Sequence, residues 1–213
     1  MPQLLQRFHA VRQRTLRLAE PLSAEDACVQ SMPDASPAKW HLAHTTWFFE
    51  TFVLGQQAPF DPDFRVLFNS YYQQVGERHP RAQRGLLTRP SLARVREYRA
   101  AVDARMQALL ARDLPAPLAD LVELGLQHEQ QHQELLLTDI KHLLSCHPQW
   151  PAYQVLDAVP VPGPEPALTW LPIARGVHKI GHAGAGFAFD NERPRHAVFL
   201  PGCEIGVSSF SVQ

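Results

Sequence analysis

Cysteine is scarce in this 213-residue chain, and long apolar runs are absent. The three cysteines, Cys28, Cys146 and Cys203, are an odd number and form no CxxC pair, which favours reduced thiols over a disulfide framework. No segment approaches the roughly 20 consecutive apolar residues that cross a bilayer. The N-terminus also lacks the apolar core of a signal peptide. We therefore expect a cytoplasmic protein with no membrane partner.

An excess of charge of either sign is also missing. The chain has 20 Lys and Arg residues against 21 Asp and Glu residues, so its net charge is −1. A balanced charge gives no electrostatic reason to expect a nucleic-acid partner. The positive charge is nearly all arginine, with lysine only at Lys39, Lys141 and Lys179. An apolar share of 45% is typical of a globular protein with one good core.

Apolar residues recur at helical spacing in four segments. The pattern predicts helices over residues 3–20, 36–55, 91–112 and 117–145, with Ser36 and Ser91 as N-caps. Frequent proline and glycine between residues 56 and 90 exclude a long helix there. Four helices with one long crossover indicate a four-helix bundle, and metal sites in such bundles are built from facing helices.

The amino-acid composition changes after the fourth predicted helix. Residues 148–172 are rich in proline and form an extended connector. Beyond it, residues 176–181 and 196–200 look like short strands around a glycine-rich loop. About 40 residues are too few for an independent domain. We therefore divide the chain into a bundle (1–147), a connector (148–172) and the start of a second domain (173–213).

The fourth predicted helix carries the motif His128-Glu-Gln-Gln-His132. Residues four apart lie on one face of a helix, so both imidazoles can reach one metal ion. A third ligand would come from the second helix, where the spacing does not choose between His41 and His44. Glu134 lies about 200° round the helix from His132, so it suits a position behind the ligands. Three histidines without a carboxylate suit an iron centre that binds a thiolate and O2, although zinc fits the spacing equally well.

Two other interpretations of the motif are weaker. It matches the HExxH pattern of zinc proteases, but Leu135 and Thr138 stand where the metzincin subclass needs glycine and histidine. The gluzincin subclass needs a downstream carboxylate ligand, and Asp139 lies too close to the motif on the same helix to serve. The histidines could instead lie on a solvated helix face. Against this, Leu121, Leu124 and Leu135 share their stripe, which predicts that the stripe faces the core.

Several segments, read together, resemble one enzyme family. Residues 36–50 (SPAKWHLAHTTWFFE), 68–72 (FNSYY), 79–85 (HPRAQRG) and 128–135 (HEQQHQEL) are similar to motifs of the sulfoxide synthases of ergothioneine biosynthesis, the EgtB family. Residues 187–196 (FAFDNERPRH) look like the opening of a formylglycine-generating-enzyme domain, also called a sulfatase-modifying-factor domain. The resemblance implies a mainly α fold, with a DinB-like four-helix bundle followed by an α+β, C-type-lectin-like second domain.

The resemblance also implies an activity. Members of the family use non-haem iron(II) and O2 to join a thiol, cysteine or γ-glutamylcysteine, to C2 of the imidazole of hercynine. The family ligand that follows Leu-Ala in the first motif corresponds to His44. The implied ligands of Fe(II) are therefore His44, His128 and His132, and the implied small-molecule partners are hercynine, the thiol donor and O2.

Further residues match positions that bind substrates in the family. Gln131 corresponds to a residue that contacts the hercynine imidazole. Arg81 and Arg84 correspond to a pair that binds the carboxylate of the thiol, for which a guanidinium fork is well suited. Tyr71 and Tyr72 are expected to line the pocket. The tyrosine that donates a proton in the family lies in a later part of the second domain.

The chain departs from the family pattern at its end. Residues 206–213 do not resemble the expected continuation, which predicts a C-terminally truncated chain that binds iron without catalysing the reaction. Alternative functions on the same architecture are selenoneine or ovothiol-type synthesis. Alternatives of other classes are a DinB-like zinc-dependent thiol S-transferase and an inactive metal-binding fragment.

Overall fold

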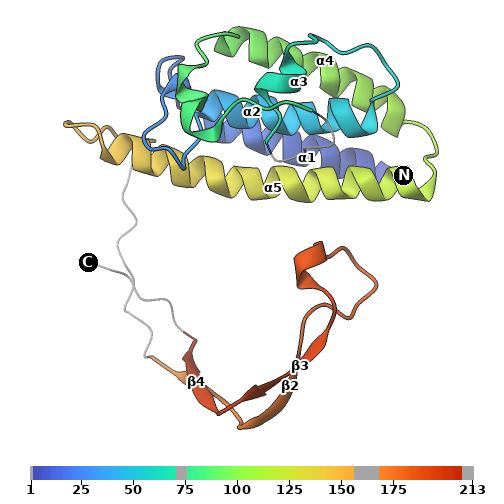
Figure 1. The fold of residues 1–213 in the computed structure, drawn as a ribbon, viewed down its shortest axis with the longest axis vertical. Coiled ribbons are helices and arrows are strands. Elements are labelled where there is room, and N and C mark those ends of the chain that lie inside the picture. Colours follow the sequence, from blue (N-terminus) through green and yellow to red (C-terminus); the bar gives the residue numbers. More distant parts are fainter. Residues whose placement is uncertain (1, 71–75, 156–167, 208–213) are drawn as a thin grey trace. The chain divides into compact units, whose positions relative to one another are not determined.

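The computed structural model describes residues 2–70, 76–155 and 168–207. The chain forms two units, Met1–Val155 and Leu156–Gln213, of which the first is helical and the second contains the strands (Figure 1). The predicted fold class, a mainly α protein with a small C-terminal sheet region, is confirmed. The predicted boundaries at residues 147 and 172 stay a prediction.

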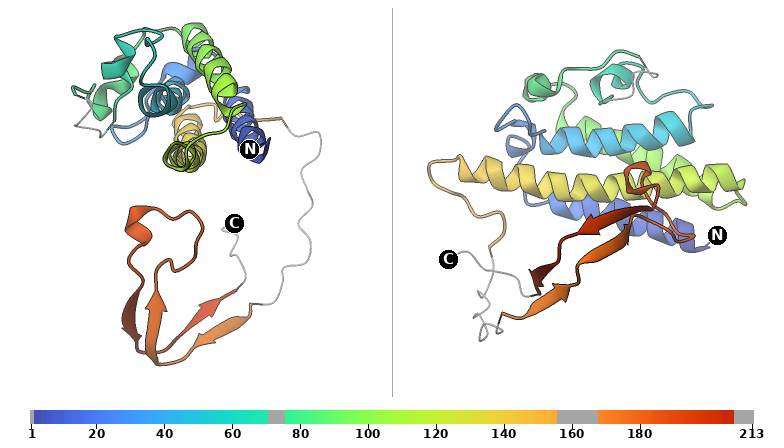
Figure 2. Two further views of the ribbon diagram at one scale, coloured as in Figure 1. Left: turned by 90° about the vertical axis from the view of Figure 1, so that its right-hand side faces the viewer. Right: turned by 60° about the horizontal axis from the view of Figure 1, so that its bottom comes forward.

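The first unit is built on four long helices. These are α1 (Pro2–Ala19), α2 (Ala38–Phe48), α4 (Leu92–Leu110) and α5 (Ala116–Ser145). Helix α5 packs against α1 and α2, and α2 packs against α4. Figure 2 shows α2 and α5 close to end-on in its left view, with α4 running obliquely beside them. The four helices predicted from the apolar periodicity are all present, with ends within a few residues of the prediction.

One of the two predicted N-caps is correct. The Ser91 hydroxyl accepts a hydrogen bond from a backbone N–H in the first turn of α4. The prediction for Ser36 was wrong, because α2 begins at Ala38 and its N-cap is Pro37, whose backbone is extended. Proline fixes φ and cannot donate, so it fits this position without a side-chain cap. The Ser36 hydroxyl instead accepts a hydrogen bond from Arg84.

Shorter elements complete the bundle. Helix α2 continues into a π-helical turn, Phe49–Val53, so the second helical segment ends close to the predicted residue 55. One 3-10 turn, Asp26–Cys28, precedes α2. The proline-rich crossover holds the single-turn helix α3 (Phe64–Leu67) and a six-residue 3-10 segment, Arg81–Leu86.

Helices α2 and α5 approach each other closely at a glycine. A Cβ atom on Gly125 would lie 2.6 Å from a ring carbon of Phe49 and 2.9 Å from one of Phe48. Any larger residue at this position would therefore push the two helices apart. The surrounding core is formed by fully buried side chains from all four helices, including Phe8, Leu42, Trp47, Val102, Met106, Leu126 and Leu136.

A buried ionic network ties α5 to α1 and α4. Glu129 is fully buried, and its carboxylate accepts hydrogen bonds from Arg12 (2.8 Å), from the Thr15 hydroxyl (2.6 Å) and from Arg99. Arg12 also donates to Asp103 at 2.6 Å. Burial alone would raise the pKa of Glu129, but the charges of the two arginines outweigh it and lower this pKa to about 2. The carboxylate is therefore held ionised inside the bundle.

The second unit consists of two antiparallel ribbons. Strand β1 (Trp170–Ile173) pairs with β4 (Cys203–Gly206), and β2 (Gly176–Ile180) pairs with β3 (His196–Leu200). Both predicted strands are thus present as β2 and β3. No side chain among residues 168–207 is fully buried. Two-stranded ribbons have marginal stability alone, so this unit lacks a core of its own within the described residues.

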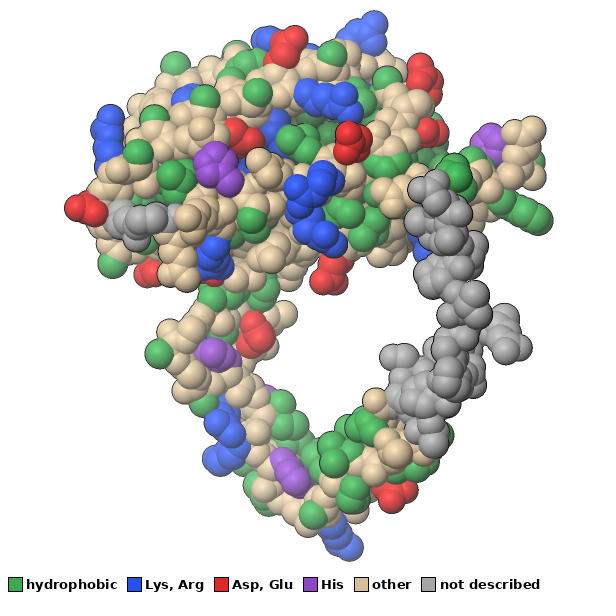
Figure 3. Space-filling view, turned by 180° about the vertical axis from the view of Figure 1, so that it is seen from behind, with side chains coloured by type: hydrophobic (Ala, Val, Ile, Leu, Met, Phe, Trp, Pro, Cys, Tyr) green, Lys and Arg blue, Asp and Glu red, His purple; other side chains and the backbone are tan. Residues whose placement is uncertain are grey.

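The surface of the helical unit carries mixed charge. On the face shown in Figure 3, side chains of Lys and Arg lie among those of Asp and Glu, without a large patch of one sign. Among the described residues, no helix combines the length and the apolar character that crossing a membrane requires.

Candidate metal centre

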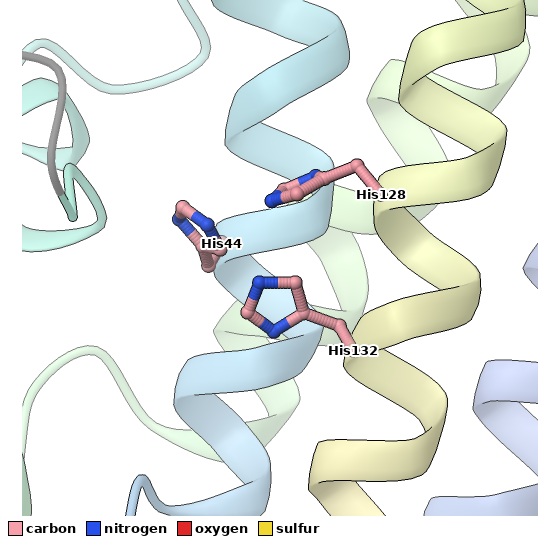
Figure 4. Close-up of side chains that lie close together, drawn as sticks. All are labelled: His44, His128 and His132. Carbon is pink, nitrogen blue, oxygen red and sulfur yellow. The ribbon is translucent and has the colours of Figure 1, made fainter. Parts of the chain in front are cut away.

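Three imidazoles from two helices converge inside the bundle. His44 comes from the middle of α2, and His128 and His132 come from successive turns of α5 (Figure 4). Their potential ligand nitrogens all lie within 4.8 Å of one another, and the group could hold a metal ion. The two α5 residues are four apart, as the motif predicted, and the close approach at Gly125 brings α2 near enough to add the third ring.

The hydrogen bonds of the rings decide which nitrogen each one can offer. Nδ1 of His44 lies 2.7 Å from the carbonyl oxygen of Phe68 and donates to it, which leaves Nε2 for another partner. Nδ1 of His132 lies 2.9 Å from Nδ1 of His41, which again leaves Nε2. Nδ1 of His128 is buried and makes no hydrogen bond to the described residues. Such an orphaned nitrogen is typical of an imidazole whose environment is completed by a further group.

Electrostatics favour neutral rings at this site. Burial, followed by the neighbouring His128, lowers the pKa of His44 well below its ordinary value. Burial lowers the pKa of His128 to about 4, and burial with the nearby histidines lowers that of His132 well below 6.5. A metal binds the neutral imidazole, so all three rings are ready to coordinate near pH 7 without losing a proton. The residues present therefore fit a divalent transition metal.

Aromatic rings hold the first histidine in place. His44 stacks on Trp40, with ring centroids 4.4 Å apart and an angle of 13° between the planes. It also stacks on Trp47 at 5.6 Å. Phe48 lies against His128, with a centroid distance of 4.9 Å. Packing on these rings restricts the rotamers of both histidines, as a preorganised metal site requires.

The buried face of α5 differs from the prediction. Leu124 and Leu135, which were expected to turn their stripe toward the core, are 36% and 45% exposed. The core face of α5 is instead centred on Val122, Leu126 and Leu136, which are fully buried. The histidines lie at the edge of that face, half-buried, because α5 packs against α1 and α2 on one side only. The prediction was therefore wrong for Leu124 and Leu135, whereas Leu121 is partly buried against the core. The two histidines do point into the bundle.

The glutamate of the HExxH pattern takes no part in the cluster of histidines. Glu129 is held by Arg12, Arg99 and Thr15, and its pKa of about 2 makes it a poor base. A zinc protease needs this carboxylate beside the metal-bound water. The geometry therefore excludes the protease interpretation.

The sequence of the chain is similar to known proteins over most of its length. The family model for the DinB superfamily matches residues 7–136, which include all three histidines. The chain belongs to the DinB superfamily. It is also 33% identical over 204 residues to the hercynine oxygenase of Mycobacterium tuberculosis, and 32% identical over 207 residues to that of Mycolicibacterium thermoresistibile. These alignments cover 92% of the chain but only 45% and 43% of the two relatives, so the chain spans less than half of their length.

The two arginines predicted to bind a carboxylate occupy different environments in the DinB bundle. Arg84 is buried and donates to the hydroxyls of Ser36 (2.9 Å) and Ser70 (3.0 Å). Its guanidinium carbon lies 3.4 Å from the ring centroid of Trp40, the residue that also stacks on His44. Arg81 is exposed and donates to a nearby backbone carbonyl. The structure thus places one arginine beside the wall of the histidine cluster and the other on the surface.

The remaining predicted residues either lie on the exposed face of α5 or do not belong to the described residues. Gln131 and Glu134 are both exposed. The part of the chain that the structure describes does not include Tyr71 and Tyr72.

One part-buried polar pair of the DinB bundle was not predicted from the sequence. His41 lies outside the three-histidine group, and its Nε2 is 2.9 Å from a carboxylate oxygen of Asp139. Asp139 lies seven residues after His132, so the two residues share one face of α5 two turns apart. This spacing is the signal that could have linked Asp139 to the histidine cluster.

Proposed function

We propose that this chain contains the metal-binding part of a non-haem iron(II)- and O2-dependent sulfoxide synthase of ergothioneine biosynthesis. The reaction would join the sulfur of cysteine or γ-glutamylcysteine to C2 of the hercynine imidazole. The observation that carries the proposal is the convergence of three imidazoles in a DinB bundle. The similarity to proteins named hercynine oxygenase supports this choice of reaction.

His44, His128 and His132 would be the metal ligands. Because the protein would supply only three ligands, the metal would keep further positions for substrates. Iron(II) would supply the redox chemistry with O2. The protein's own contribution is to present three nitrogens on two packed helices, with rings fixed by hydrogen bonds and stacking.

The substrate-binding roles also belong to the proposal. Gln131 would contact the hercynine imidazole, and Arg81 and Arg84 would bind the carboxylate of the thiol. The partners of Arg84 include two neutral hydroxyls, those of Ser36 and Ser70. A carboxylate makes stronger, charge-assisted hydrogen bonds, so it can compete with them for the guanidinium. Glu134 would support the ligands from behind, and Tyr71 and Tyr72 would line the pocket.

The two units would have separate tasks. Residues 1–147 would form the bundle, residues 148–172 a connector, and residues 173–213 the start of a formylglycine-generating-enzyme domain in a cytoplasmic protein. The absence of fully buried side chains among residues 168–207 supports a unit that is completed by further residues.

The first test is metal binding by the chain itself. The metal-free chain is titrated with Fe(II) under anaerobic conditions in the presence of a chromophoric chelator. We expect one Fe(II) per chain, and loss of this binding in His132→Ala. The control variant is His142→Ala, which removes an α5 histidine whose Nδ1 contacts Ser31 and which lies outside the group.

The second test is the reaction. A chimera joins residues 1–207 to the C-terminal part of the Mycobacterium tuberculosis relative, and mass spectrometry follows products from hercynine, each thiol and O2. We expect a hercynine–thiol sulfoxide that requires both Fe(II) and O2. Turnover of the thiol without O2 on the zinc-loaded protein would instead indicate thiol S-transfer. Absence of any product from a folded, iron-loaded chimera, with the mycobacterial relative active under the same conditions, would contradict the proposal.

A further inference from the structure

A chain of three polar side chains runs from the edge of the bundle to the histidine cluster. A carboxylate oxygen of Asp139 lies 2.9 Å from Nε2 of His41, and Nδ1 of His41 lies 2.9 Å from Nδ1 of His132. His41 is almost completely buried, and the Asp139 side chain is 12% exposed. The same carboxylate oxygen accepts the backbone N–H of Ser36 at 2.8 Å, which fixes the outer end of the chain.

Only one arrangement of protons satisfies all three groups when both rings are neutral. The Asp139 carboxylate can only accept, so Nε2 of His41 must carry the proton that it shares with Asp139. Nδ1 of the same ring is then unprotonated and accepts. Nδ1 of His132 must therefore carry a proton, and its Nε2 keeps a free lone pair. The opposite arrangement would set a lone pair of His41 against the carboxylate and place a proton on Nε2 of His132.

This choice of tautomer matters for the neighbouring rings. Nε2 is the nitrogen of His132 that the hydrogen bond with His41 leaves available to the group formed with His44 and His128. His44 obtains the same tautomer from the Phe68 carbonyl oxygen. Histidine ligands generally have their second nitrogen held in this way by a carboxylate or a carbonyl, and this contact fixes both the tautomer and the orientation of the ring. Here a second histidine stands between the ligand and the carboxylate.

We propose that His41 and Asp139 are positioning residues, which hold His132 in the Nδ1–H tautomer with Nε2 directed at the metal position. The proposal rests on the metal centre proposed above. It also explains why His41, three residues before His44 on the same helix, is buried without belonging to the three-histidine group.

Two substitutions of His41 separate positioning from packing. His41→Gln keeps an acceptor for the Nδ1–H of His132 and a donor for Asp139, whereas His41→Phe fills the space and provides neither. The matched control is His142→Phe, the same replacement elsewhere on the bundle. Asp139→Ala provides a second test if His41→Phe does not fold. The Asp139 side chain is partly exposed, so its truncation leaves little cavity.

Two measurements are made on the full chain. Long-range 1H–15N correlation spectra of the metal-free, 15N-histidine-labelled protein give the tautomer of each ring, and competition with a chromophoric chelator gives the affinity for Co(II). We expect the Nδ1–H tautomer of His132 in the wild type and in His41→Gln, and loss of this preference in His41→Phe and Asp139→Ala. Co(II) affinity should fall about 10- to 100-fold in His41→Phe, remain within about threefold in His41→Gln, and be unchanged in His142→Phe.

The outcomes distinguish the two proposals. The same His132 tautomer and the same Co(II) affinity in the wild type and in His41→Phe would overturn the positioning role. An equal loss of Co(II) affinity in His41→Phe and His41→Gln would also overturn it, because packing alone would then explain the loss. A wild-type chain that binds no Co(II) would contradict the metal centre itself, whereas the spectra of the metal-free protein would still decide the role of His41.

Discussion

Replacing Glu129 by glutamine should strongly lower the free energy of unfolding of the bundle. Glu129 is adjacent in sequence to the proposed ligand His128, but its role is in stability. The Glu129 carboxylate is fully buried and accepts hydrogen bonds from Arg12, Arg99 and Thr15. Glutamine keeps the shape but removes the charge, and it turns one acceptor into a donor that faces a guanidinium or a hydroxyl. Removal of one partner from a buried ionic network costs about 3–5 kcal/mol, because the remaining charges stay buried and unpaired.

The pKa of Glu129 gives a second estimate of how much the buried carboxylate contributes to the free energy of unfolding. Folding lowers it from 4.5 to about 2, and this difference of about 2.5 corresponds to about 3 kcal/mol. The ionised form is the one that folding favours. The stabilisation is therefore complete above pH 4.5 and is lost as the pH falls from 4.5 through about 2. The difference in stability between the wild type and Glu129→Gln should narrow over that range.

Urea unfolding followed by circular dichroism measures both effects. The matched control is Glu123→Gln, the same replacement on the same helix. Glu123 pairs with Arg7, whose side chain is 44% exposed, so its loss should cost less than about 1 kcal/mol. If Glu129→Gln lost no more stability at pH 7 than the control, the reasoning on the buried network would be refuted. A difference that stayed constant from pH 5 to pH 3 would refute the pKa argument.

Two further substitutions test the packing that positions the histidine cluster. Gly125→Ala should destabilise the bundle by about 1–3 kcal/mol despite the better helix propensity of alanine, because the new methyl group would overlap the rings of Phe48 and Phe49. The substitution should also weaken Co(II) binding. Unchanged urea midpoints and Co(II) affinity would show that α2 and α5 can separate freely. Tyr98→Phe should cost about 1.5–3 kcal/mol in the same unfolding assay, since its buried hydroxyl donates to the Glu50 carboxylate at 2.7 Å. Tyr153→Phe, which removes a hydroxyl that donates to a neutral carbonyl, should cost less, and equal losses would argue against the charged hydrogen bond.

Local features of the sequence determined the helices and two of the three histidines of the candidate metal centre. Apolar periodicity and proline positions predicted all four long helices, and Ser91 was correctly predicted as an N-cap. The spacing of His128 and His132 placed both rings on one face of α5. These predictions succeeded because helical geometry depends on residues that are three or four apart.

Only the tertiary structure decided how the helices dock against one another. Spacing could not choose between His41 and His44, because the choice depends on how α2 docks against α5, and that depends on the close approach at Gly125. The buried face of α5 was also misjudged, because leucine is compatible with either side of a helix that packs against neighbours on one side only. The cations that surround Glu129 come from α1 and α4. Contacts between residues about 30 to 120 positions apart leave no periodic trace in the sequence, so the folded chain is needed to reveal them.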